Sequence, residues 1–152
     1  MKQLNRLFDR TDHILVSWMG KYGTVWLRIS IGIIFLWFGV LKFFPGLSPA
    51  EGLAADTIRV VTFGIFSDKV ILYGLALLET LIGVGLLINR FLRTTLFLLF
   101  MQMAGTFLPV LFFPGEIFTR FPYALTLEGQ YIVKNLIIIG AGIVIGASVR
   151  KR

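Results

Sequence analysis

Four apolar stretches dominate this chain of 152 residues and restrict what it can fold into. They cover about 24–44, 70–88, 94–113 and 131–147, and each is close to the roughly 20 residues that a helix needs to cross a bilayer core. Backbone polar groups in lipid must be hydrogen-bonded within their own segment, so such stretches predict helices. We therefore expect an all-α fold, in which a single membrane domain over 1–152 forms an integral four-helix bundle.

The composition supports a membrane protein and excludes several kinds of chemistry. Hydrophobic residues make up 57% of the chain and the mean hydropathy is +0.85, above the roughly 45–50% apolar content of a soluble domain. The absence of cysteine excludes disulfides and thiolate chemistry, and with one histidine, His13, we expect no metal site. No P-loop, nucleophile elbow or H-E-x-x-H pattern occurs, so we do not expect the chain to be an enzyme on its own.

Two further segments are predicted outside the spans. Apolar residues within 1–22 recur on one face of a helix, which predicts an amphipathic helix on the membrane surface. No alanine occurs before Ala50, so we expect no signal-peptide cleavage. A short helical element is expected to begin near Ser48, with Glu51 reaching back to the cap. The apolar run Ile58–Phe66 within this region is too short to cross a bilayer, so we expect it to lie at the extracytoplasmic interface or to pack over the bundle.

The basic residues indicate an orientation. Ten of the fifteen fall on one predicted side: Lys2, Arg6, Arg10, Lys21, Arg28, Arg90, Arg93, Arg150, Lys151 and Arg152. Because cytoplasmic loops carry an excess of Lys and Arg, both termini and the turn at 89–93 are predicted to be cytoplasmic. The net charge of +7 lies at these boundaries and forms no continuous stripe, so we expect no nucleic-acid partner.

Polar residues inside the spans are the best candidates for a site, because an ionisable group in mid-bilayer is costly and usually faces protein. At about 1.5 Å per residue, Glu79 and Gln102 fall at similar depths and are expected to meet. No basic residue shares that depth, so we expect Glu79 to carry a proton. Two interpretations remain open: a hydrogen bond that joins helices, or a group that handles protons or contacts a ligand.

A second group is predicted near the outer ends of the first and fourth spans. Lys42 and Lys134 are expected to face one polar pocket with Glu128 as counter-ion, and Gln130 and Asn135 lie close by in sequence. The alternative is that the lysines extend to the headgroups or form structural ion pairs. We expect Arg28, near the cytoplasmic end of the first span, to contact lipid phosphates.

Glycines recur along all four spans, and Gly142 and Gly146 form a G-x-x-x-G pattern that favours close helix packing in lipid. This face could pack inside the monomer or form a homodimer.

Three segments resemble the DoxX-like membrane proteins, and most closely their YkgB/RclC-type branch. They are the run 28–43 (RISIGIIFLWFGVLKF), Leu78-Glu79 followed by GVGLL at 83–87, and 128–135 (EGQYIVKN). The resemblance covers about residues 24–147. It implies a four-helix protein of the bacterial inner membrane, linked with oxidant stress, reactive-chlorine resistance or quinone-connected redox partners.

Together, these observations predict a polar intramembrane pocket that binds a small ligand, with quinone as the first candidate, or couples to a membrane redox protein. A lipid-accessible groove with a few polar groups could hydrogen-bond the carbonyls of a quinone. Two other classes stay open: a subunit of a small transporter or channel, and a non-catalytic scaffold for other membrane proteins.

Overall fold

The computed structural model describes residues 2–44, 46–48 and 51–150, with side chains at all of these positions except 2–8 and 10. The helices are α1 (Lys2–Leu41), α2 (Glu51–Val61), α3 (Asp68–Ile88), α4 (Leu92–Thr106), α5 (Leu108–Phe112), α6 (Pro114–Ile117) and α7 (Leu127–Val149). Two short strands, β1 (Phe118–Arg120) and β2 (Ala124–Leu125), pair antiparallel. The chain is thus mainly helical, as predicted, with one small hairpin that was not.

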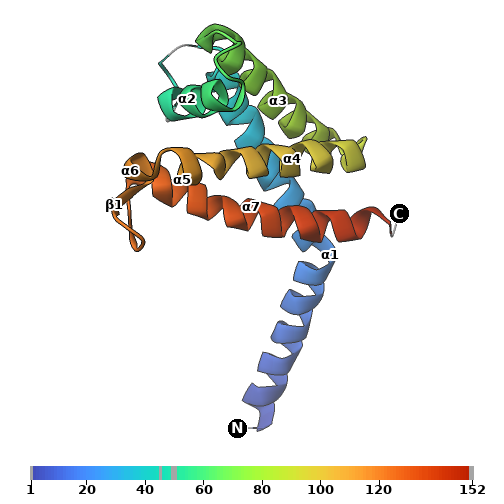
Figure 1. Cartoon of the computed structure of the whole chain (residues 1–152). Coiled ribbons are helices and arrows are strands. Elements are labelled where there is room, and N and C mark those ends of the chain that lie inside the picture. Colours follow the sequence, from blue (N-terminus) through green and yellow to red (C-terminus); the bar gives the residue numbers. More distant parts are fainter. Residues whose placement is uncertain (1, 45, 49–50, 151–152) are drawn as a thin grey trace.

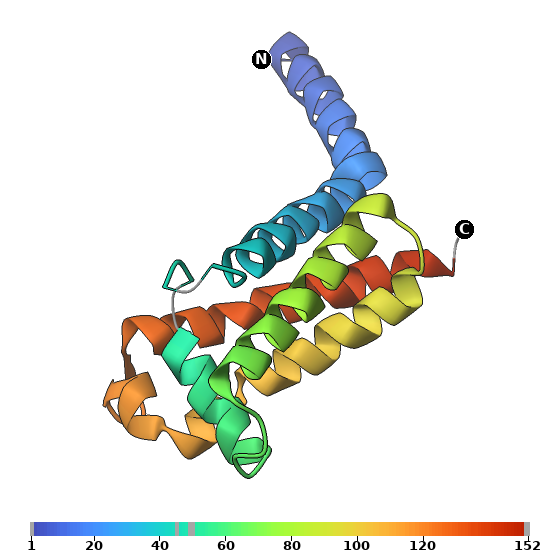
Figure 2. The ribbon, with the colours of Figure 1, turned by 90° about the horizontal axis from the view of Figure 1, so that it is seen from above.

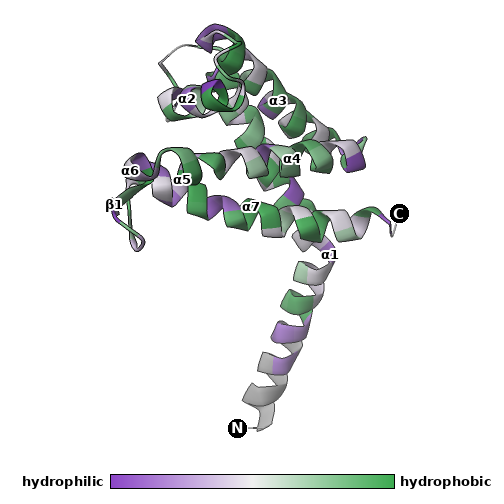
Figure 3. Cartoon of the chain, viewed as in Figure 1, coloured by the Kyte–Doolittle hydropathy of each residue, from purple (hydrophilic) through white to green (hydrophobic). Residues whose placement is uncertain are grey.

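Four helical stretches are long and apolar enough to cross a membrane: Thr11–Leu41, Asp68–Ile88, Leu92–Phe112 and Leu127–Val149. They confirm the four predicted spans. The first begins 13 residues earlier than predicted, and the other ends differ from the predicted ones by four residues or fewer. Figure 3 shows hydrophobic colour along most of α3, α4 and α7, and a mixture of hydrophilic and hydrophobic colour in the projecting part of α1. The chain therefore has the architecture of a multi-pass membrane protein.

The bundle consists of α3, α4, α7 and the C-terminal half of α1 (Figures 1 and 2). The short turn between α3 and α4 lies at the same end as the end of α7, whereas α2, α6 and the hairpin lie at the opposite end. Residues from α1, α3, α4 and α7 share one apolar core, which includes Phe35, Ile82, Leu99 and Ile145. The two ends of the bundle thus match the two predicted sides of the membrane, without fixing which side is cytoplasmic.

The surface helix predicted over 1–22 and the span predicted from 24 are one continuous helix of 40 residues. No proline occurs before Pro45, so nothing in the sequence ends the helix earlier. The first half projects from the bundle with Ile14, Leu15 and Trp18 exposed, and α1 changes direction near its middle (Figure 2). The leucines and phenylalanine predicted on the apolar face before Asp9 lie outside the described side chains, so a surface location stays a prediction.

Glycine allows α1 and α3 to approach backbone to backbone, and this is the most extensive helix contact of the fold. A Cβ atom on Gly83 would clash with the backbone nitrogen of Leu36, and one on Gly39 would lie 2.7 Å from the nitrogen of Thr80. Between α7 and α4, a Cβ on Gly142 would lie 3.1 Å from the ring of Phe100. Gly142 therefore packs inside the monomer, whereas Gly146 has only Leu96 near it, at 3.6 Å. A homodimer through this motif stays a prediction.

The outer segments depart from the prediction in detail. Helix α2 ends at Val61, and the chain then turns through Phe63 and Gly64, both with positive φ. The predicted cap at Ser48 falls partly outside the described residues, and Glu51 instead accepts a hydrogen bond from the backbone nitrogen of Gly46 at 3.0 Å. The 58–66 run is therefore helical only as far as Val61, and its place relative to the membrane stays a prediction.

Candidate functional site

Three side chains meet inside the bundle, one from the turn after α1, one from α3 and one from α4, and we call them the buried polar cluster: Lys42, Glu79 and Gln102. The ammonium of Lys42 lies 2.6 Å from Oε2 of Glu79, and Nε2 of Gln102 donates to Oε1 of Glu79 at 2.8 Å. The side chains of Lys42 and Glu79 are each 12% exposed, and Gln102 is 8% exposed. Both oxygens of one carboxylate are therefore engaged by donors from neighbouring helices.

The contact between Glu79 and Gln102 confirms the prediction made from helical rise. Glu79 lies near the middle of α3 and Gln102 in the C-terminal half of α4, and the two antiparallel helices bring these positions to one level. A carboxylate and an amide at matching depth in lipid gain a hydrogen bond that neither could make with hydrocarbon. Depth counting along two connected helices was therefore sufficient here.

The expectation that no cation shares the depth of Glu79 is wrong. Lys42 follows the last residue of α1, yet its long side chain reaches Glu79 within α3. Side chains at the end of a helix point back toward its N-terminus, and the lysine stem adds several ångströms of reach. Backbone depth alone does not show this reach. The prediction that Glu79 carries a proton depended on the absence of a nearby cation, and Lys42 is such a cation.

The predicted outer pocket divides into two parts. Lys42 pairs with Glu79 and not with Glu128, while Lys134 is exposed on α7 with its ammonium 5.6 Å from the ring centroid of Tyr131. No ion pair between Lys134 and Glu128 occurs among the described residues. The structure thus brings Lys42 into the cluster and leaves Lys134 outside it.

The other two predicted pocket residues also lie on α7. Gln130 is exposed, and Nδ2 of Asn135 donates to Oγ1 of Thr106 at 3.2 Å, which links α7 to the end of α4. Asn135 therefore joins two helices, whereas Gln130 faces away from the bundle.

We expect Arg28 to contact lipid phosphates, and the structure places its guanidinium against the end of α3. Its side chain is buried, with 8% of the residue exposed, and Nη1 donates to the carbonyl oxygens of Leu86 and, at 3.3 Å, Leu87. These carbonyls belong to the last turn of α3, where the C=O groups have no partner within the helix. A cation there also complements the negative end of the helix dipole. Arg28 thus joins α1 to the end of α3.

One hydroxyl beside the cluster was not predicted. The Oγ1 atom of Thr80 is buried and has no hydrogen-bond partner within the described part of the chain. Thr80 follows Glu79 in α3 and packs against Gly39 of α1. Buried polar groups are nearly always bonded, so an unbonded hydroxyl packed against Gly39, one residue after Glu79, is unusual. Threonine in a helix commonly bonds the backbone of its own helix, so the sequence gives no signal that this hydroxyl is unbonded.

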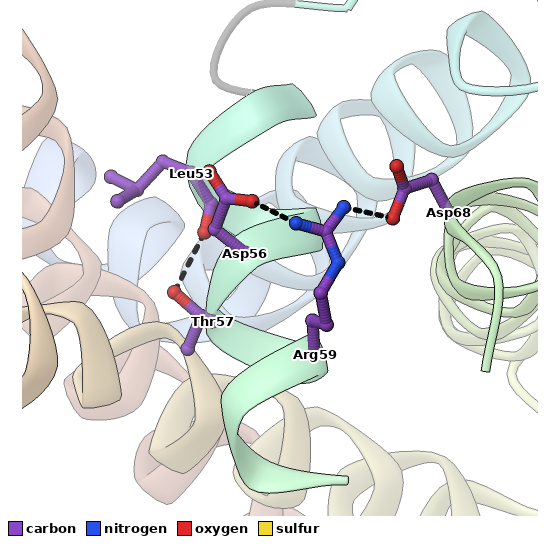
Figure 4. A network of polar contacts seen from close by, with 5 residues as sticks. All are labelled: Leu53, Asp56, Thr57, Arg59 and Asp68. Atoms are coloured by element: carbon purple, nitrogen blue, oxygen red, sulfur yellow. Dashed lines mark hydrogen bonds and ion pairs between the residues drawn. The ribbon is translucent and has the colours of Figure 1, made fainter. Parts of the chain in front are cut away.

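A second set of charges lies at the end of the bundle that carries α2, and we call it the outer ion pairs after the predicted orientation: Arg59 of α2 with Asp56 and Asp68. Figure 4 shows the guanidinium between the two carboxylates, at 2.8 Å from Asp56 Oδ1 and in contact with Asp68 Oδ1. Hydrogen bonding to Asp68 and the charge of Asp68 raise the pKa of Arg59, with Asp56 adding to the effect. These pairs connect α2 to the start of α3.

The donor and acceptor set of the buried polar cluster suits an uncharged polar ligand better than a metal ion. Among the described residues no group of three His, Asp or Glu side chains could hold a metal. The cluster instead offers an ammonium with further N–H donors and an amide.

No family model matches the chain, and searches of curated proteins and of solved structures found no match.

Proposed function

We propose that this chain is a small multi-pass protein of the bacterial inner membrane that binds the polar head of a quinone at the buried polar cluster and works with a membrane redox partner. The proposal includes cytoplasmic termini and a role in resistance to oxidants such as reactive chlorine. Support for the setting comes from the four spans, the distribution of basic residues, and the resemblance to DoxX-like proteins.

A single observation carries the proposal: an ion pair buried among spanning helices with an amide and an unpaired hydroxyl beside it. If the cluster served only to hold helices together, apolar packing would do so at lower cost, since burying two charges is expensive even when they pair. Intramembrane charges that face protein usually belong to functional sites. The cluster is therefore the best candidate for ligand contact.

A quinone head fits the chemistry of these groups. Its two carbonyl oxygens accept hydrogen bonds, and the ammonium of Lys42 and the amide of Gln102 are donors. Its isoprenoid tail is apolar and would lie among the spanning helices or in lipid. The cluster is not sealed, because Lys42 and Glu79 each keep 12% of the side chain exposed.

When bound, a quinone would accept two electrons from a redox partner together with two protons. Within this chain, Lys42 and Glu79 are the ionisable groups in contact and could hold or pass a proton at the ligand oxygen. The partner supplies the electrons, since the chain has no cysteine.

The test begins with protein purified from bacterial membranes in lipid nanodiscs and extracted for quinones by mass spectrometry, followed by titration with a short-chain quinone. Lys42→Gln with Glu79→Gln removes both charges but keeps amides that can bond each other, so the bundle should fold. We expect this double variant and Gln102→Leu to weaken binding about five- to thirty-fold, the effect of losing one or two hydrogen bonds.

Lys134→Gln is the matched control, because it removes a lysine near the same end of the bundle but outside the cluster. Equal quinone affinity in the wild type and the double variant would contradict the proposal, as would the absence of quinone binding by the wild type. Proton or ion flux in liposomes without quinone would instead favour a transporter, and activity that needs only a partner would favour a scaffold.

The link to oxidant stress is tested in cells. Bacteria that express the wild-type chain should survive hypochlorous acid better than cells with the double variant at equal membrane abundance. Equal survival would separate the cluster from oxidant resistance while leaving the binding result to stand on its own.

A further inference from the structure

A surface groove between α4 and α7 lies at the end of the bundle opposite the hairpin, and it has a polar end and an apolar length. Its volume is about 380 Å³. Arg93 and Arg150 line it together with Leu96, Phe97, Phe100, Gly146 and Val149. Arg93 lies in the first turn of α4 and Arg150 directly follows α7, so one cation lies at the N-terminus of α4 and the other at the C-terminus of α7.

The two arginines are available to an external anion. Both are exposed, and within the described part of the chain neither forms an ion pair. The first turn of α4 adds to their attraction, because its N-cap residue Phe91 makes no side-chain cap and leaves backbone N–H groups unbonded. Unbonded N–H groups and the positive end of the helix dipole favour a phosphate at this position.

The remainder of the groove is suited to an acyl chain. Leu96, Phe100 and Gly146, which lacks a side chain, line the apolar part of the groove. Phe97 also lines the groove and is 67% exposed. A Cβ atom on Gly146 would meet only Leu96, at 3.6 Å, so the space above the glycine is open. Two cations at a helix boundary followed by an apolar groove between spanning helices match a phospholipid whose headgroup is anionic.

We infer that this groove is a binding site for one anionic phospholipid, with its phosphate between Arg93, Arg150 and the start of α4 and an acyl chain along Leu96, Phe97 and Phe100. The inference does not depend on quinone binding at the buried polar cluster, which involves none of these residues.

The test is a titration of the full-length protein with phosphatidylglycerol and, separately, phosphatidylcholine in detergent, followed by native mass spectrometry. The wild type should bind phosphatidylglycerol more tightly. Replacing both arginines (Arg93→Gln and Arg150→Gln) should weaken that binding by about five-fold per arginine and remove the preference. Arg90→Gln is the matched control, since Arg90 is exposed on the same turn but does not line the groove.

Two variants test the apolar part without a change of charge. Gly146→Leu should fill the groove, and Phe97→Ala should remove a contact from an exposed ring that the fold does not need; both should weaken phosphatidylglycerol binding while circular dichroism stays as in the wild type. If Gly146→Leu fails to fold, Phe97→Ala alone decides this point.

Three results would overturn the inference. They are equal affinity for the two lipids, an equal loss in Arg90→Gln, and displacement of the lipid by glycerol 3-phosphate at matched concentration. The last would mean that the arginines bind any phosphate and that the groove contributes nothing.

Discussion

The buried polar cluster and the outer ion pairs use the same kinds of group in different surroundings. Lys42 and Glu79 are each 12% exposed as side chains, whereas Arg59 and Asp56 are 45% exposed and Asp68 is 54% exposed. Removing one member of a buried pair leaves a charge away from water, while exposed pairs are replaced by hydration and screened by salt. Burial, and not the number of contacts, should therefore decide which charges the fold depends on.

The largest effect should follow from Lys42→Met, which keeps the stem of the side chain and removes the charge. The carboxylate of Glu79 would stay buried without a cation, and we expect the free energy of unfolding to fall by about 3–5 kcal/mol. Reversible unfolding in mixed detergent micelles, followed by circular dichroism, measures it. Lys134→Met provides the comparison. Equal losses of unfolding free energy in the two variants would show that burial of Lys42 beside Glu79 does not add to stability.

Arg28→Met should have the next largest effect. The substitution leaves the carbonyls of Leu86 and Leu87 without their donor, and a hydrogen bond to a charged group contributes about 1.5–3 kcal/mol. The same unfolding measurement applies, with Arg90→Met as an exposed arginine for reference. If Arg28→Met has the same free energy of unfolding as the wild type, lipid or water replaces the guanidinium at the end of α3.

Gln102→Leu should destabilise the bundle by about 1 kcal/mol, because it removes one of two donors to Glu79 but leaves the ion pair in place. A double-mutant cycle with Glu79→Gln isolates the coupling between the two positions. Additive effects of the two substitutions would show that the contact does not contribute to stability.

The smallest effect belongs to Arg59→Gln. The outer ion pairs are exposed, so we expect no resolved change in melting temperature at 1 M salt, where the Debye length is about 3 Å, and at most a small one at low salt. A large loss that persists at high salt would overturn the contrast between the two regions.

The spans were predictable because long apolar runs leave the backbone no alternative to a helix in lipid. The Glu79–Gln102 contact was predictable too, since a short turn joins α3 to α4 and helical rise fixes which positions share a level. Both inferences depend on periodic backbone geometry, which sequence spacing encodes directly.

The predictions failed where a contact depends on the reach of a long side chain or where the backbone is irregular. Lys42 and Arg28 bond groups on α3, and counting along a single helix cannot show this. The hairpin that joins α6 to α7 lies in a mixed segment without alternation of apolar and polar residues. The junction near residue 22 was read as a boundary because polarity changes there, although a helix can continue through a change of polarity.

The glycine contact between α1 and α3 acts as a spacer that sets the range of an electrostatic interaction. Gly39 contacts the backbone of Thr80. Thr80 follows Glu79 directly, and Gly39 lies three residues before Lys42, so the contact is close to both members of the ion pair. A methyl group at Gly39 would push the two helices apart, and the ammonium would then no longer stay 2.6 Å from the carboxylate. A purely steric change at an uncharged position would thus appear in experiments as the loss of a charge pair.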